Sequence, residues 1–220
     1  MTIHCAISYF EGNSGGYLLG CDSTLQISRT VQSLVKEFPM IVEKSFRGAH
    51  FVGFIRGRLP SSILPTTPAA IAAQFSARLR SLDFCFDGIQ QGITYTHPSL
   101  CDLSAYTLLI AKQQADHLEL FNVSNQRPLP ENNHRATRLH HLELPTLAAQ
   151  PHSVVFYAPC TPNYLQFRFR ERCNFVRAKK ILEQLLTERS VLKISPQLGR
   201  YHPGKASLFA VDFTGIRQID

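Results

Sequence analysis

The chain of 220 residues lacks any uninterrupted apolar run approaching the ~20 residues that a membrane-spanning helix needs. Its first residues contain neither the basic segment nor the apolar stretch of a secretory signal. An internal repeat, a low-complexity tract and a linker that would divide the chain are also missing. We therefore expect one domain over residues 1–220, located in the cytoplasm and not bound to a membrane.

Metal and phosphate sites lack their usual sequence signals. The six cysteines show no Cys-x-x-Cys spacing, so we expect reduced thiols, as is usual in the cytosol. No cysteine or carboxylate stands at ligand spacing from His134, His140 and His141, which favours a polar loop or strand edge there. The glycines at 12, 15 and 16 precede no Lys-Ser/Thr pair, which argues against a phosphate-binding loop. We expect no metal and no organic cofactor.

Positive charge is in excess, with a formal net charge of +7 and a pI of 9.3. Such an excess can indicate an anionic partner. The basic residues are scattered, however, and cluster only over 168–172 and 177–180. The second of these segments fits the solvent face of an amphipathic helix. We therefore do not expect nucleic acid as a partner, and a basic nucleic-acid-associated protein is the third-ranked interpretation.

The predicted elements come in blocks of strands and blocks of helices. Two apolar runs, 2–9 and 17–21, flank a Gly-rich break and predict a hairpin. This block order favours an antiparallel sheet system with packed helices over strict βαβα alternation. Further strands are predicted at 49–55, 104–111, 117–123, 138–144, 153–157 and 207–213, helices at 68–82, 162–171 and 175–188, and a polar loop at 125–137, while 26–36 is ambiguous.

Thr2 stands at the start of the first predicted strand. If Met1 is removed, the Thr2 Oγ can act as a nucleophile and the free α-amine can take its proton. The unperturbed pKa of an α-amine is near ~8, so much of it is neutral at working pH. A threonine after the initiator methionine is also ordinary in an edge strand, so the rest of the sequence has to decide.

The features after Thr2 resemble the proteasome β-subunit family of N-terminal-threonine hydrolases, which includes the bacterial HslV peptidase. They are a second strand that ends in Asp22 and Ser23, a lysine at Lys44, a strand over 52–57, and an Ala-rich helix. The later runs 108–111, 117–121 and 209–216 are similar to the central hairpin and the last strand of that family. The resemblance implies an α+β, four-layer αββα sandwich of two antiparallel sheets flanked by helices, the Ntn-hydrolase fold.

The resemblance also implies a catalytic set of Thr2, Asp22, Lys44 and Gly57. A cationic Lys44 would favour the Thr2 alkoxide and keep the α-amine neutral, and Asp22 would orient that lysine. The Gly57 N–H would stabilise the oxyanion, a contribution of about 3 kcal/mol. Lys36 competes with Lys44, which we prefer because its step of 13 residues to Gly57 better suits two paired strands.

Residues 158–162 stand where the family has a Gly-Ser-Gly turn. Thr161 or Cys160 would then supply the supporting hydroxyl or thiol. Cys160 with a histidine such as His152 is an alternative nucleophile, although a small buried cysteine is the more ordinary interpretation.

The implied function is hydrolysis of peptide or unfolded protein inside a homo-oligomeric ring, with any ATP-dependent unfoldase left unknown. The alternative is a catalytically inactive ring or scaffold protein of the same fold. The missing turn favours this alternative, and retention of Met1 would decide for it.

Overall fold

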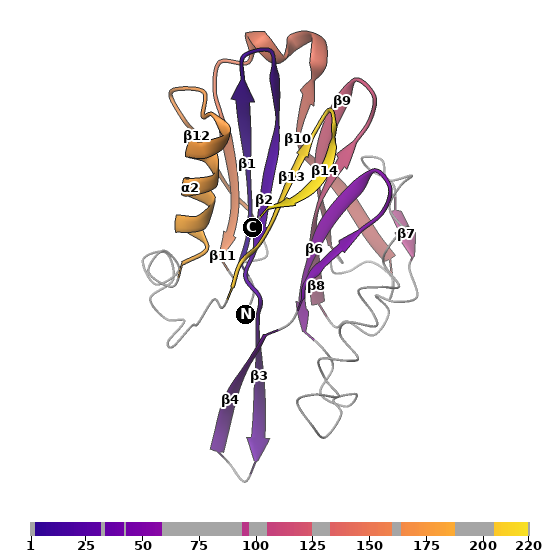
Figure 1. The fold of residues 1–220 in the computed structure, drawn as a ribbon. Helices are drawn as coiled ribbons and strands as arrows, with labels where there is room; N and C mark the ends of the chain where they lie inside the picture. Colours follow the sequence, from indigo (N-terminus) through magenta and orange to yellow (C-terminus); the bar gives the residue numbers. More distant parts are fainter. Residues whose placement is uncertain are drawn as a thin grey trace.

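Two six-stranded sheets packed face to face form the body of the protein (Figure 1). The computed structural model describes residues 3–31, 34–41, 43–58, 94–96, 105–124, 133–159, 164–187 and 205–219. Every strand pair recorded in these ranges is antiparallel. No helix in the same ranges has both the length and the apolar character to cross a membrane.

The first sheet is built around the hairpin at the start of the chain. The hairpin is confirmed, but its turn occupies only residues 12 and 13, because Gly12 adopts a φ of 59° that costs glycine little. The strands predicted at 153–157 and 207–213 are confirmed as its flanking members. The sheet order is β12 (Leu165–Arg168), β11 (Val154–Pro159), β1 (Ile3–Glu11), β2 (Ser14–Cys21), β13 (Ser207–Asp212) and β14 (Gly215–Ile219).

The second sheet confirms the strands predicted at 49–55, 104–111 and 117–123. Its strand at Asn133–Glu143, predicted at 138–144, begins earlier than predicted and takes in residues that the sequence assigned to a polar loop at 125–137. A bulge between Arg138 and His140 shifts the register of that strand. The sheet order is β5 (Ser45–Arg47), β6 (Phe51–Arg58), β8 (Ala105–Gln113), β9 (His117–Ser124), β10 (Asn133–Glu143) and β7 (Thr94–Thr96).

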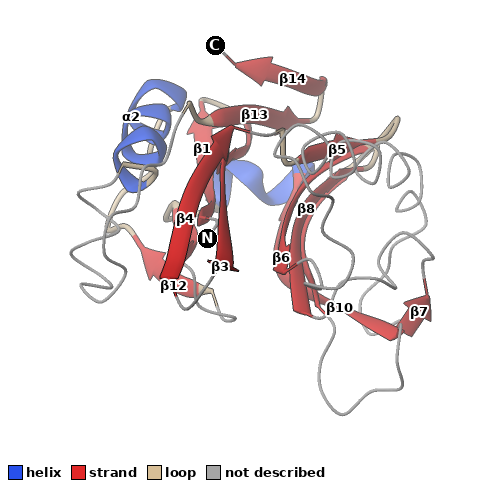
Figure 2. Cartoon of the chain, turned by 90° about the horizontal axis from the view of Figure 1, so that it is seen from below, coloured by secondary structure: helices blue, strands red, loops and turns tan. Residues whose placement is uncertain are grey.

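The main core lies between the two sheets. Alternate residues of each strand point to one face, so Ala6 and Phe10 of β1 share a core with Phe54 of β6 and Leu109 of β8. The opposite face of the first sheet carries a second core with helix α2 (Phe175–Leu185). Figure 2 shows α2 on the side of this sheet that faces away from β6 and β8.

The predicted four-layer αββα sandwich is wrong, because the structure is mostly β with two antiparallel sheets. Within the described ranges the helices are α2 and the short 3-10 helix η3 (Leu144–Ala149), and α2 packs on the first sheet alone. Part of the predicted helix at 162–171 is instead strand β12, whose apolar and polar residues alternate with the strand period. The helix predicted at 68–82 lies outside the described residues.

A separate hairpin, β3 (Thr24–Val31) with β4 (Leu34–Ile41), projects from one end of the body (Figure 1). Its strands pair without a break from Thr24 with Ile41 to Val31 with Leu34. The hairpin follows Asp22 and Ser23 directly and ends just before Lys44. An antiparallel hairpin returns the chain to its starting point, so residues far apart in sequence meet at its base.

Candidate functional site

A buried ion pair between Asp22 and Lys44 lies at the base of this hairpin. Lys44 Nζ is 2.8 Å from Asp22 Oδ2, and the two side chains are 1% and 0% exposed, respectively. Burying both charges costs several kcal/mol per ion, and apolar side chains of similar volume are often at least as stable in such places. A contribution to fold stability therefore does not explain why the ion pair is buried here, and we treat it as a candidate functional group.

Asp22 also joins the pair to the start of the chain. Its Oδ1 accepts a hydrogen bond of 2.5 Å from the backbone N–H of Ile3, the first residue of β1. The register of the hairpin, with His4 opposite Cys21, brings these two residues together. Thr2 itself lies outside the described residues, but the peptide group that Asp22 contacts is the one that follows it.

The position of Lys44 is fixed by a hydrogen bond to its own backbone and by the side chain of its neighbour Glu43. Its carbonyl oxygen accepts a hydrogen bond of 3.1 Å from Ile55 N of β6. The neighbouring Glu43 carboxylate accepts from Ser45 N at 3.0 Å and from Ser207 Oγ of β13 at 3.4 Å. These contacts fix the backbone on each side of the lysine.

Gly57 lies two residues beyond Ile55 on the same strand, opposite Tyr106 of β8. Two strand residues span about 6.6 Å, so Gly57 and Lys44 share one end of β6. The structure thus brings Asp22, Lys44 and Gly57 to one region. Lys36 instead pairs with Arg29 in the middle of the projecting hairpin.

Sequence reasoning missed a buried polar group on β1, one residue after Ile3. His4 is fully buried, its Nδ1 is 3.0 Å from Tyr164 Oη, and its ring centroid is 6.3 Å from that of Phe54. Alternation along β1 places His4 on the face directed at the second sheet, together with Ala6. The spacing of two residues from Thr2 was the available signal, whereas nothing in the sequence connects position 4 with position 164.

Ser23 was named with Asp22 in the sequence but was assigned no role. It is 6% exposed, and its Oγ has no hydrogen-bond partner in the part of the chain that the structure describes. It follows Asp22 directly in the chain, before the start of β3.

The supporting residues Cys160 and Thr161 lie outside the described residues. Strand β11 ends at Pro159, which is opposite Ile3 in the pairing with β1, so the chain leaves the sheet close to the start of β1. His152, the histidine considered as a partner for Cys160, is half-buried. The arrangement of a cysteine nucleophile therefore stays a prediction.

In the histidine-rich stretch, His140 is held by a contact with Tyr17. His140 Nδ1 is 2.8 Å from Tyr17 Oη between the sheets. Burial, followed by the positive charges of His141 and Arg168, lowers the pKa of His140 to about 4. In the described ranges no three His, Cys, Asp or Glu side chains gather as a metal site requires.

A shallow surface hollow of about 410 Å³ lies at the opposite end of β6 and β8 from the ion pair. Its lining includes His50, Lys112 and Phe213. None of the predicted site residues contributes to it, so the hollow is not part of the candidate site.

Comparison with models of protein families gives no match, and comparison with curated proteins finds no relative of this sequence. Membership of the proteasome β-subunit family therefore stays a prediction.

Proposed function

We propose that this protein is a threonine-type peptidase that hydrolyses peptide bonds with Thr2 as its N-terminal nucleophile. The supporting observation is the buried Asp22–Lys44 pair, which Asp22 connects to the backbone N–H immediately after Thr2. A buried cation beside an N-terminal hydroxyl residue has a direct chemical use. It favours the alkoxide and keeps the neighbouring α-amine neutral by like-charge repulsion.

The reaction would proceed in two halves. The Thr2 Oγ attacks the carbonyl carbon of the substrate while the α-amine takes the hydroxyl proton, and the Gly57 N–H donates to the oxyanion. Collapse of this intermediate breaks the C–N bond, and the proton passes from the α-amine to the leaving amine. Water then attacks the Thr2 ester, its proton goes to the α-amine, and the free hydroxyl is restored. Every group in these reaction steps comes from the protein, the substrate or water.

The wider proposal concerns substrate and assembly. The substrate is a peptide or an unfolded protein, and the enzyme forms a homo-oligomeric ring in the cytoplasm, with Thr161 or Cys160 as the supporting hydroxyl or thiol. These points derive from the resemblance to the proteasome β-subunit family. An ATP-dependent unfoldase as a partner would follow from the same resemblance, and its identity is left unknown.

The second candidate is an inactive scaffold protein, and one observation favours it. Strand β11 ends in Ala158 and Pro159 beside the start of β1, where the family has a Gly-Ser-Gly turn. Proline has no backbone N–H to donate, and alanine has no hydroxyl. A chain that has lost these groups can keep the ion pair as an inherited structural element.

The experiment that separates the candidates begins with the mass of the intact protein. Chains that start at Thr2 are then treated with a peptidyl epoxyketone, which reacts with both the Oγ and the α-amine of an N-terminal threonine. We expect one adduct per subunit at residue 2, and none in Thr2→Ala protein. An unmodified Thr2 at high inhibitor excess supports the scaffold, and an adduct on Cys160 supports the cysteine nucleophile.

A further inference from the structure

The outermost strand of the first sheet, β12, exposes apolar side chains. Leu165 is 40% exposed and Phe167 is 48% exposed, although their partners across the strand pair, Tyr157 and Val155, are buried. Phe169 continues the same face and packs partly against the core beneath α2. An edge strand with exposed apolar residues is a template for pairing with another chain, and proteins normally protect such edges.

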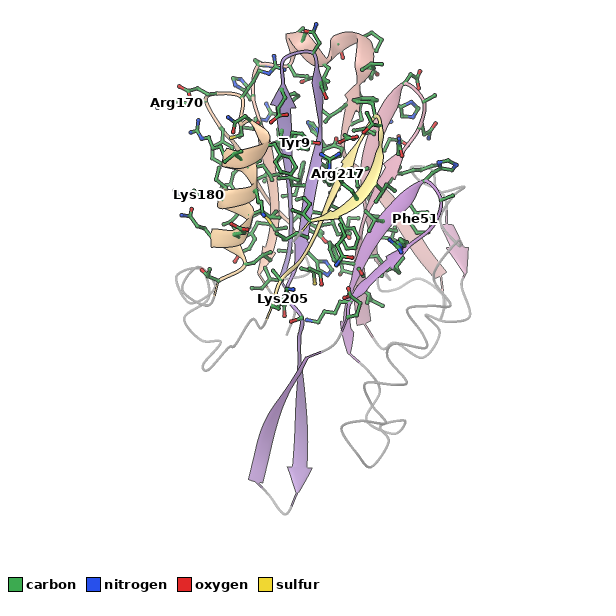
Figure 3. The ribbon with its side chains drawn as sticks, viewed as in Figure 1. Tyr9, Phe51, Arg170, Lys180, Lys205 and Arg217 are labelled. Carbon is green, nitrogen blue, oxygen red and sulfur yellow. The ribbon has the colours of Figure 1, made fainter. Side chains whose placement is uncertain are left out.

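Exposed positive charge lies on this strand at Arg168, just beyond it at Arg170, and on helix α2 at Lys180. Arg168, Arg170 and Lys180 are exposed, and none of them forms an ion pair in the described part of the chain. Figure 3 shows Arg170 and Lys180 on the same side of the molecule as α2. Arg177 and Lys179, by contrast, are paired with Glu171 and Glu183. The residual charge at β12 is therefore positive.

We propose that β12 is a docking strand for an extended, acidic segment of a partner protein, which pairs with it as an added strand. The backbone of the partner would extend the sheet order beyond β12, since an edge strand offers unpaired donors and acceptors. Apolar side chains at alternate positions of the partner would cover Leu165 and Phe167. Carboxylates would lie near Arg168 and Arg170.

The charge argues against a second copy of this chain as the occupant. Two copies would bring two sets of unpaired arginines together, and each chain carries a formal net charge of +7. The alternation of Leu165 and Phe167 with Gln166 and Arg168 favours an extended peptide over nucleic acid. Binding of phosphate groups would use the arginines but would leave the exposed side chains of Leu165 and Phe167 without a partner. This site is independent of the proposed peptidase activity.

The test uses the full-length protein and a fluorescein-labelled peptide of alternating glutamate and valine, followed by fluorescence anisotropy. We expect saturable binding that weakens between about 0.1 M and about 1 M salt, because the charges are exposed. A peptide of equal composition with its glutamates in one block should bind at least about tenfold more weakly, and so should a peptide with N-methyl groups on alternate amides.

Variants locate the site. Binding should weaken at least about tenfold in the double variant Arg168→Glu/Arg170→Glu and in Phe167→Ser. Two controls should change binding less than about twofold. They are Arg47→Glu/Lys205→Glu, which makes the same change in net charge, and Val176→Ser, which removes an exposed apolar side chain elsewhere. Hydrogen exchange on the unmodified protein provides a readout that needs no variant. The amides of residues 164–170 should exchange more slowly with peptide bound.

Three results would overturn the proposal. One is the absence of saturable binding, and another is equal weakening by the β12 variants and their charge-matched control. The third is tighter binding of an oligothymidylate than of the alternating peptide, which would assign the basic surface to nucleic acid.

Discussion

The charge of Lys44 has two separable consequences, one for folding and one for the proposed chemistry. Lys44→Met leaves Asp22 buried without its Lys44 counter-charge and should lower the free energy of unfolding by about 3–5 kcal/mol. Asp22→Asn/Lys44→Met removes both charges and keeps an oxygen for the Ile3 N–H, so it should recover most of that loss. Urea denaturation measures the stability, and cleavage of a fluorogenic peptide measures the activity.

The double variant should stay inactive although it is stable. Peptide cleavage at the wild-type rate by this variant would refute the role proposed for Lys44. Lys36→Ala is the matched control, because Lys36 lies on the projecting hairpin opposite Arg29 and should leave most of the turnover intact. Loss of activity from Lys36→Ala alone would show that the assignment of the lysine is wrong.

His140 makes stability depend on pH in a defined window. Its folded-state pKa is lowered from 6.5 to about 4, chiefly by burial, so the unfolded chain binds the proton first as the pH falls. The contribution of the neutral ring is fully present above pH 6.5 and is lost between there and about pH 4. His140→Gln should flatten this part of the stability profile, as measured by thermal unfolding at a series of pH values. An unchanged slope would show that other groups cause it.

At the scale of elements, Gly20 of β2 sets how closely α2 approaches the first sheet. A Cβ at this position would lie 2.7 Å from Leu186 Cδ1 and 2.9 Å from Leu182 Cδ2. Gly20→Ala should therefore cost about 1–3 kcal/mol by overpacking, as measured by chemical denaturation. Leu182→Ala in the same chain should relieve part of this cost, whereas additive losses would show that the contact with the helix is not the cause.

The elements that the sequence predicted well are those whose type is evident within the segment itself. The first hairpin, β8 and β13 are apolar-rich runs that are buried along most of their length, and α2 carries an apolar face at the helical period. The exception is β12, where apolar and polar residues alternate with the strand period but a helix was predicted over 162–171. The pairing with Val154–Tyr157 of β11, which decides for a strand, is a long-range contact that the local sequence does not contain.

For the layers and the site, too, the sequence predicted local features better than contacts between distant segments. Asp22 and Lys44 were selected from the sequence, and the structure brings them into contact. The predicted four-layer sandwich, which the family resemblance implied, was wrong because the order of elements along a chain does not determine which sheet faces the helices cover; in the described residues α2 covers one face of the first sheet. His4 was missed because its partners, Tyr164 and Phe54, come from distant segments.

At the scale of the whole molecule, the proposed ring predicts a mass well above that of one chain. Sedimentation velocity should give a single species whose mass is a multiple of 24.8 kDa and does not change on dilution. The reason is that a closed ring satisfies all its interfaces at once. A monomer throughout the concentration range would contradict the assembly while leaving the ion pair and its chemistry to be tested separately.

Because of the projecting hairpin, the number of residues between Asp22 and Lys44 does not determine how far apart their side chains lie. Its strands leave and return at one place, so residues can be gained or lost in pairs at the tip without moving either end. Natural sequences can therefore vary freely in the number of residues between these two positions and still conserve the contact. A search for distant homologues should treat this interval as a gap of open length and anchor the alignment on its two ends.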